Sequence, residues 1–240
     1  MVSEELWIGE AVARQERRAT FVRALLVTTV AVGAISLLFS FEERELLLTA
    51  QQGEESDATS AETVDGRVRV AGIAQLSMLV VTAIVWLMWV HRAYANLRLV
   101  GTRVTQHTPG WAVGYWLIPI VNLFRPYQVM RELWLRSADA NAVSSVAGAR
   151  TPPILTWWWV YWLLSGVVGR VLRRMSNAAE TVEAMLRVMN VAIVADLLAI
   201  ASAILAFYVL SRIADAQSAF ITRSAAVCPW APGRKERGVS

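Results

Sequence analysis

Cysteine and histidine are scarce in this 240-residue chain, which has a single Cys (Cys228) and two His. One cysteine excludes an intramolecular disulfide, and the two isolated histidines give no Cys/His spacing suited to zinc. The sequence also lacks H-E-x-x-H, G-x-S-x-G and any glycine-rich phosphate loop. We therefore expect no bound metal, no cofactor and no enzymatic activity.

Charge is also low, since only 18% of the residues are charged and 56% are apolar. A soluble domain usually has about a quarter of its residues charged. The net charge is +4, and nearly all the basic residues are Arg. These Arg residues flank apolar runs and do not form a basic stripe interleaved with stacking aromatics. The pattern therefore indicates helix anchoring at a lipid bilayer, and we expect no nucleic-acid partner.

Four long apolar runs account for much of this composition. They cover residues 24–41, 70–90, 151–169 and 188–211, and the last contains the one charged residue among them, Asp196. A helix needs about 20 apolar residues to cross a bilayer. The sequence therefore predicts an all-α, polytopic membrane bundle with four spanning helices.

The remaining segments suggest how the chain is organised. Residues 1–23 are expected to be a cytoplasmic N-terminal segment, 24–217 the membrane helical domain, and 218–240 a disordered cytoplasmic tail. Residues 42–67 are rich in Glu and Asp and poor in aromatics. Such a composition favours a mobile loop, here outside the cytoplasm.

Residues 111–124 form a shorter apolar stretch, interrupted by Pro119. This length suits a re-entrant or interfacial segment better than a crossing helix. The next stretch, 126–137, has apolar and polar side chains on opposite halves of a helical wheel, so it predicts an amphipathic helix on the membrane surface or against a partner. Further on, Asn177 and Glu180 have the spacing of a capping box for the last helix.

The distribution of Arg favours four crossings over five. If residues 111–124 do not cross, both termini and residues 91–150 are cytoplasmic, and most basic residues lie on that side. A fifth crossing would divide them almost equally. We therefore expect a protein of the cytoplasmic membrane with both termini inside.

Three motifs resemble a known family: R-A-Y-A-N-L at 92–97, T-P-G-W-A-V-G-Y-W-L-I-P-I-V-N-L-F-R-P-Y at 108–127, and R-E-L-W at 131–134. They are similar to an uncharacterised bacterial membrane family, domain of unknown function 4328. The likeness covers about residues 70–217. It implies a multi-pass membrane protein and supplies no ligand, reaction or catalytic residue.

Asp196 is the sharpest candidate for a functional site, because a carboxylate inside a spanning helix is costly. We expect Arg170 to be its partner, either in a proton or cation relay or in a structural ion pair; a protonated Asp bonded to a neighbouring helix is the other alternative. Pro119 would free backbone carbonyls, and Asn122 adds an amide nearby, so this helix break is a second candidate polar site.

The basic, amphipathic stretch from Arg92 to Arg136 is the candidate interface, with Arg92, Tyr127, Arg131 and Trp134 as its principal residues. Two functions remain open. The first is a non-catalytic scaffold or partner-binding subunit, with a protein partner or a second copy of the chain. The alternative is a subunit of a small oligomeric transporter or channel that uses Asp196.

Overall fold

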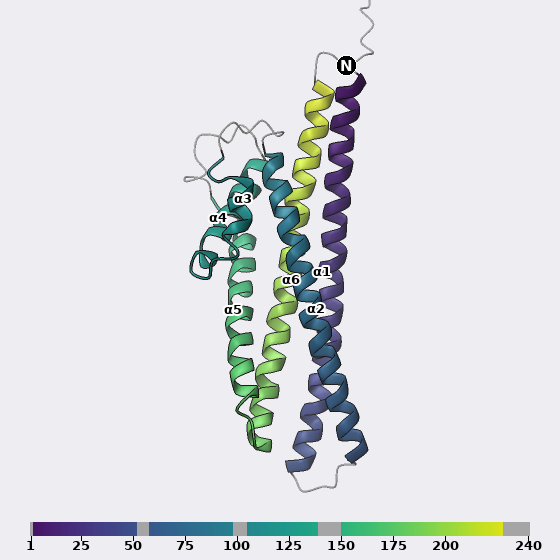
Figure 1. Ribbon diagram of the computed structural model, residues 1–240, viewed down its shortest axis with the longest axis vertical. Helices are drawn as coiled ribbons and strands as arrows, with labels where there is room; N and C mark the ends of the chain where they lie inside the picture. The colour runs from purple at the N-terminus through teal and green to yellow at the C-terminus, as the bar shows by residue number, and fades with distance from the viewer. Residues whose placement is uncertain (1, 52–57, 98–104, 139–149, 228–240) are drawn as a thin grey trace, which may run out of the picture. The chain divides into compact units, whose positions relative to one another are not determined.

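The computed structural model describes residues 2–51, 58–97, 105–138 and 150–227, and every regular element within these ranges is helical. In chain order they are α1 (Val2–Gln51), α2 (Ala58–Asn96), α3 (Pro109–Gly114), the short 3-10 helix η1 (Val121–Leu123), α4 (Arg125–Ala138), α5 (Pro153–Ser176) and α6 (Val182–Val227) (Figure 1). The prediction of an all-α fold is confirmed for the described part of the chain.

Three helices in the described ranges are long and apolar enough to cross a membrane. Their apolar stretches are Ala13–Thr49 of α1, Arg69–Asn96 of α2 and Val182–Ala219 of α6, and these contain the predicted runs 24–41, 70–90 and 188–211. Most of the run 151–169 lies in a helix, α5, which is not among the three helices that are long and apolar enough to cross a membrane. The fourth span therefore stays a prediction.

The acidic segment 42–67 is largely helical, which corrects the expectation of a long mobile loop. Helix α1 continues to Gln51 and α2 begins at Ala58, so only 52–57 lie outside the described residues. Glu, Leu and Arg are strong helix formers, and they dominate the end of α1. An ion pair between Arg67 and Glu42, with 3.2 Å between Nη1 and Oε1, joins the two helices. Acidic composition alone was a poor guide to loop structure here.

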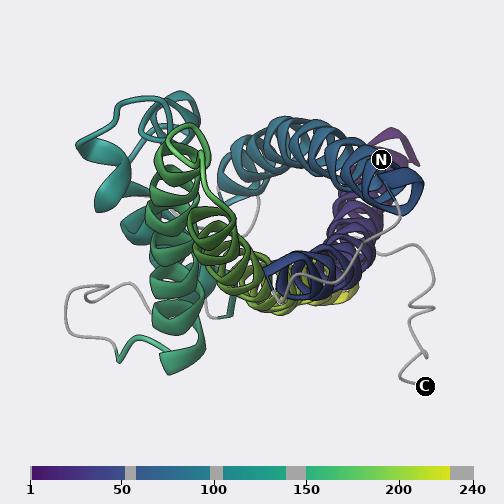
Figure 2. The same ribbon diagram turned by 90° about the horizontal axis from the view of Figure 1, so that it is seen from below.

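Both ends of α6 also differ from expectation. The helix extends to Val227, so the prediction of a disordered tail from residue 218 is wrong for 218–227, and 228–240 lie outside the described residues. At the other end the cap is Thr181, whose hydroxyl accepts the backbone N–H of Ala184 at 3.2 Å. Asn177 instead caps the C-terminus of α5. A short turn at 177–181 thus separates these antiparallel helices (Figures 1 and 2).

The chain divides into two compact units, and α1, α2 and α6 contribute to both. Unit 1 comprises the described residues within Met1–Phe21, Trp89–Arg150 and Leu210–Ser240, and unit 2 comprises those within Val22–Met88 and Thr151–Val209. Unit 1 contains α3, η1 and α4, whereas unit 2 contains α5.

Unit 2 exposes large apolar side chains along all four of its helices. Examples are Leu38 of α1, Leu76 and Leu79 of α2, Val167 of α5 and Leu197 of α6. Its buried side chains include several that are small or polar, among them Ala71, Thr82, Ser202, Ala203 and Ala206. An apolar exterior and small residues between helices are typical of a bundle surrounded by lipid.

Unit 1 has a more conventional core of large apolar side chains. Tyr94 of α2, Leu97 just after it, Met130 and Leu133 of α4, and Ile213 of α6 are all almost fully buried. The exposed large apolar residues of this unit are mostly confined to one segment, 111–124, between the start of α3 and α4. Unit 1 therefore has a well-packed apolar core and one segment, 111–124, with several exposed apolar side chains.

Candidate functional site

Asp196 lies in the interior of unit 2, where side chains from three helices meet. It is only 8% exposed, and its Oδ1 accepts a hydrogen bond from Nε2 of Gln75 on α2 at 2.8 Å. The hydroxyls of Ser36 and Ser40, which are buried one turn apart on α1, lie beside this carboxylate. The candidate polar site at Asp196 thus includes three further side chains that the sequence did not indicate, and all three are uncharged.

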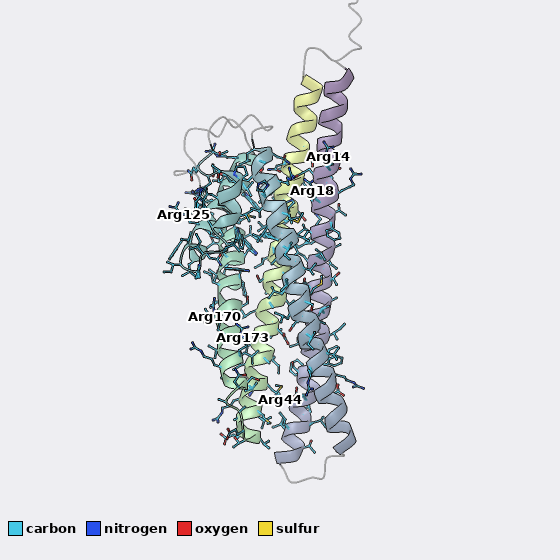
Figure 3. The ribbon with its side chains drawn as sticks, viewed as in Figure 1. Arg14, Arg18, Arg44, Arg125, Arg170 and Arg173 are labelled. Atoms are coloured by element: carbon cyan, nitrogen blue, oxygen red, sulfur yellow. The ribbon has the colours of Figure 1, made fainter. Side chains whose placement is uncertain are left out.

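Arg170 does not join this site. Its side chain is exposed on α5, as is that of Arg173 (Figure 3), and among the described residues it forms no ion pair with Asp196. The expectation of an Asp196–Arg170 pair is therefore wrong. Matching depth along two helices gave that pairing, but depth does not specify which face of α5 turns inward.

The break at Pro119 lies in unit 1, in the turn that connects α3 to η1. Around it Leu117, Ile118 and Ile120 are exposed, with Leu117 and Ile120 at 74% and 76%. Asn122 follows in η1, and its buried Oδ1 has no hydrogen-bond partner within the described part of the chain. We call residues 111–124 the apolar loop.

An aromatic stack holds the base of the apolar loop. Thr108 caps α3 by accepting the backbone N–H of Trp111, and the Trp111 ring stacks on Tyr115 with 5.4 Å between centroids. The guanidinium of Arg125, at the start of α4, lies 5.7 Å from the centre of the Tyr115 ring. Tyr115 of the apolar loop thus contacts Trp111 of α3 through a ring stack and Arg125 of α4 through a cation–π contact.

A buried ion pair lies next to the segment that precedes α3. Glu132 of α4 is fully buried, and its Oε1 accepts Nε of Arg136 at 2.7 Å and the backbone N–H of Gln106 at 2.9 Å. The hydroxyl of Tyr94 donates to the other carboxylate oxygen and accepts the backbone N–H of His107 at 2.9 Å. We call Tyr94, Glu132 and Arg136 the ionic core; it joins the end of α2 to α4 and to the segment before α3.

His107 borders the ionic core. Its Nδ1 lies 3.3 Å from the hydroxyl of Tyr115, while its buried Nε2 has no partner within the described residues. Burial lowers the pKa of His107, and the positive charge of Arg125 lowers it further, against the opposing effect of Glu132. The imidazole is therefore held in its neutral form more strongly than a free histidine.

Amide side chains form a second network in unit 1. Gln217 of α6 donates from Nε2 to the carbonyl of Ala93 at 3.0 Å and to Oγ of Ser137 at 3.1 Å. Its Oε1 accepts Nε2 of Gln15 from α1 at 3.0 Å, and Oε1 of Gln15 accepts Nδ2 of Asn96 at 2.8 Å. Four helices, α1, α2, α4 and α6, are thereby joined by hydrogen-bonded side chains around Gln217.

The predicted amphipathic helix at 126–137 is confirmed as α4 (Arg125–Ala138), but its polar half is not simply a solvent face. Glu132 and Arg136 are buried in the ionic core. Of the candidate interface residues, Arg92 is exposed, whereas Tyr127, Arg131 and Trp134 are half-buried. The wheel misplaced Glu132 because a buried, paired carboxylate resembles an exposed one in the sequence; its i,i+4 spacing to Arg136 was the available signal.

Comparison with known proteins gives a family and no function. No curated protein and no solved structure matched the chain. One family model, described as a domain of unknown function (DUF4328), matches residues 52–215. This range includes the motifs at 92–97, 108–127 and 131–134. It also includes Gln75, Asp196 and the whole ionic core. The chain therefore belongs to the DUF4328 family, whose role is unknown.

Proposed function

We propose that this chain is an integral membrane protein that acts as a non-catalytic scaffold and binds a protein partner through the apolar loop of unit 1. The observation that carries the proposal is the contrast within unit 1. Its core is well packed and internally bonded, yet Trp111, Leu117, Ile120 and Phe124 are more than half exposed on one connected segment. Exposed apolar patches of this kind are typical of interaction sites.

The frame beneath the loop supports this function. The Thr108 cap and the Trp111–Tyr115 stack hold the start of the segment, Arg125 of α4 lies over Tyr115, and the ionic core holds Gln106 and His107 just before it. A pre-organised apolar surface loses little conformational entropy when a partner binds. Arg92 and Arg125, exposed in the same unit, are suited to a partner with acidic residues around an apolar centre.

Site-specific photocrosslinking tests this proposal. A benzophenone amino acid replaces Leu117 or Ile120 in the apolar loop, and irradiated membranes are analysed for adducts by mass. We expect a discrete protein adduct, either with another protein or with a second copy of the chain. The matched control is the same substitution at Leu79, an exposed apolar residue of unit 2, which should give lipid adducts. Only lipid adducts at all three positions would overturn the proposal and make the apolar loop an interfacial anchor.

The orientation we propose places both termini and unit 1 on the cytoplasmic side of the cell membrane. It rests on the distribution of Arg described above. In a Cys228→Ser background, a cysteine at Ser144 should be protected from a membrane-impermeant maleimide in intact cells and become reactive on permeabilisation. Labelling in intact cells would place this segment outside and support five crossings.

A second candidate function, a subunit of an oligomeric transporter or channel, is favoured by one observation. Asp196 is a buried carboxylate surrounded by polar groups from two other helices, in a unit with a lipid-like exterior. Reconstituted vesicles should then show cation flux that Asp196→Asn abolishes. Intact, correctly inserted protein without any flux would remove this function and leave the scaffold.

A further inference from the structure

Among the residues that the structure describes, the carboxylate of Asp196 has polar neighbours but no counter-charge. Gln75 donates a hydrogen bond to it, the buried hydroxyls of Ser36 and Ser40 lie beside it, and none of the three side chains can carry a positive charge. Arg44 lies one turn beyond Ser40 on α1, but its guanidinium bonds to Asn190 and Glu45. Within the described residues, Asp196 forms no ion pair. A lone negative charge inside a lipid-surrounded bundle is unstable unless a bound positive charge neutralises it.

The two serine hydroxyls differ from three other hydroxyls of these helices, which donate to a carbonyl of their own helix. Thr28 and Thr29 of α1 donate to the carbonyls of Ala24 and Leu25, one turn back, and Ser165 of α5 donates to Trp162. That is the usual way in which a hydroxyl is satisfied in a membrane helix. Ser36 and Ser40 are instead buried against a carboxylate on another helix. Their placement provides two oxygen atoms beside the same charge.

We propose that Asp196, Ser36, Ser40 and Gln75 form a binding site for a monovalent hard cation of the Na⁺ type, an assignment that deepens the transporter function given above. The site offers one carboxylate oxygen, two hydroxyl oxygens and, after a half-turn of the Gln75 amide, its Oε1. An all-oxygen set favours hard cations over copper, zinc or iron. A single carboxylate neutralises one positive charge, so a divalent ion would leave net charge inside the bundle.

Protonation of Asp196 is the competing way to neutralise the charge. A protonated carboxyl needs one acceptor for its hydrogen, whereas this site surrounds the carboxylate with three polar side chains. The arrangement supplies more oxygen atoms than a proton requires. Na⁺ and a proton should therefore compete for Asp196, and that competition gives the test.

Dicyclohexylcarbodiimide modifies protonated carboxyl groups in apolar surroundings, and peptide mass spectrometry can follow the adduct at Asp196. The full-length protein is labelled in mild detergent with NaCl or with an equal concentration of N-methyl-D-glucamine chloride. We expect Na⁺ to slow the labelling of Asp196, with a requirement for more Na⁺ at lower pH. Labelling of Asp196 at the same rate with and without Na⁺ would overturn the proposal.

Matched serine variants test the ligand set. Ser36→Ala together with Ser40→Ala should keep Asp196 reactive but raise the Na⁺ concentration needed for protection by about 10- to 100-fold. The corresponding Thr variants retain both hydroxyls and should keep most of the protection. Ser165→Ala, which removes a hydroxyl bonded to its own helix, should behave like the wild type. Unchanged protection in the double Ala variant would contradict the assignment of the two hydroxyls.

The same preparation separates the site from the transport function. Na⁺ protection without Na⁺ flux in vesicles would keep the site and remove transport. Flux that persists while Asp196 labelling ignores Na⁺ would remove the site and leave a transport route elsewhere. Protection by Ca²⁺ alone, with none by Na⁺, would contradict the monovalent assignment.

Discussion

Helix α6 carries a buried polar side chain in each unit, Asp196 in unit 2 and Gln217 in unit 1, and the two are accommodated differently. Gln217 is fully buried among groups that satisfy both its N–H bonds and its carbonyl. Asp196 is buried among uncharged groups, and within the described part of the chain no positive charge compensates its own. The first arrangement is complete by itself, whereas the second requires a bound cation or proton.

The charged groups of the two units differ in the same way. In unit 1 the buried carboxylate, Glu132, is neutralised within the chain by Arg136. In unit 2 the ion pairs at Glu42 and Glu183 are on exposed side chains, and the buried carboxylate of Asp196 forms no ion pair with any residue that the structure describes. In unit 1 the buried charge of Glu132 therefore stabilises the fold, whereas in unit 2 the buried charge of Asp196 can interact with a bound ion. Four predictions test this contrast.

The largest effect is expected from Glu132→Ala in unit 1. The substitution leaves the Arg136 guanidinium, which is 10% exposed, without its anion, and it removes the acceptor of Tyr94. Breaking a buried ion pair by removing one partner typically costs about 3–5 kcal/mol. Denaturant unfolding in mild detergent, or the melting temperature followed by Trp fluorescence, should show this loss.

The control for Glu132→Ala is Glu183→Ala in unit 2. Its i,i+4 partner is Arg187, and the two side chains are 72% and 63% exposed. An exposed pair of this kind contributes less than about 1 kcal/mol. Equal losses in the two variants would mean that the ionic core is not a structural element, and the contrast between the units would fail.

The next effect concerns the amide network. Gln217→Leu keeps a similar volume but removes the donor to the Ala93 carbonyl and the acceptor of Gln15 Nε2 in the core of unit 1. An unsatisfied buried polar group costs about 1–3 kcal/mol. Thr82→Val in unit 2 is the comparison, since it removes only the 3.3 Å contact with Thr29, which still donates to Leu25. Unfolding in mild detergent should show the larger loss for Gln217→Leu.

The sequence predicted the helices better than it predicted what they bury. The runs 24–41, 70–90 and 188–211 have the length and composition of spans, and all three lie within long helices. Helix ends were less predictable: Glu42–Gln51 of α1 was expected to be a loop, because acidic residues were counted as loop formers although they also favour helices. Hydrophobic periodicity predicted α4 correctly, because the amphipathic pattern at 126–137 extends over almost the whole of this short helix.

Partner choice between side chains could not be predicted from the sequence. Asp196 was recognisable, since a carboxylate in an apolar run is costly wherever it points. Its partners depend on the rotation of each helix about its axis, and that rotation selects Gln75, Ser36 and Ser40 in place of Arg170. Gln15 and Gln217 carried no local signal, since their hydrogen bond joins residues at opposite ends of the chain.

A smaller, pH-dependent effect is expected at His107. Its pKa is lowered by burial, so the unfolded chain binds this proton at a higher pH than the folded chain does. The stability from neutral His107 is therefore complete above the ordinary histidine pKa of about 6.5 and is lost as the pH falls toward the lowered value. Melting temperatures of wild type and His107→Gln, compared at pH values on either side of that range, should show a steeper acid loss in the wild type. Parallel curves would mean that His107 contributes nothing to this loss.

The smallest effect on stability is expected from Asp196→Asn, although it changes the candidate site most. In Na⁺-free buffer the variant loses an uncompensated charge and keeps an amide that can bond to Gln75, Ser36 and Ser40. Its melting temperature should therefore equal or slightly exceed that of the wild type, opposite in direction to Glu132→Ala. Na⁺ should then raise the melting temperature of the wild type and not that of Asp196→Asn, because a ligand stabilises only the form that binds it, by about 2.7 kcal/mol at a hundred times its dissociation constant. A large loss of stability in Asp196→Asn without Na⁺ would show that Asp196, like Glu132, is there to hold the helices together, and the contrast between the two units would no longer stand.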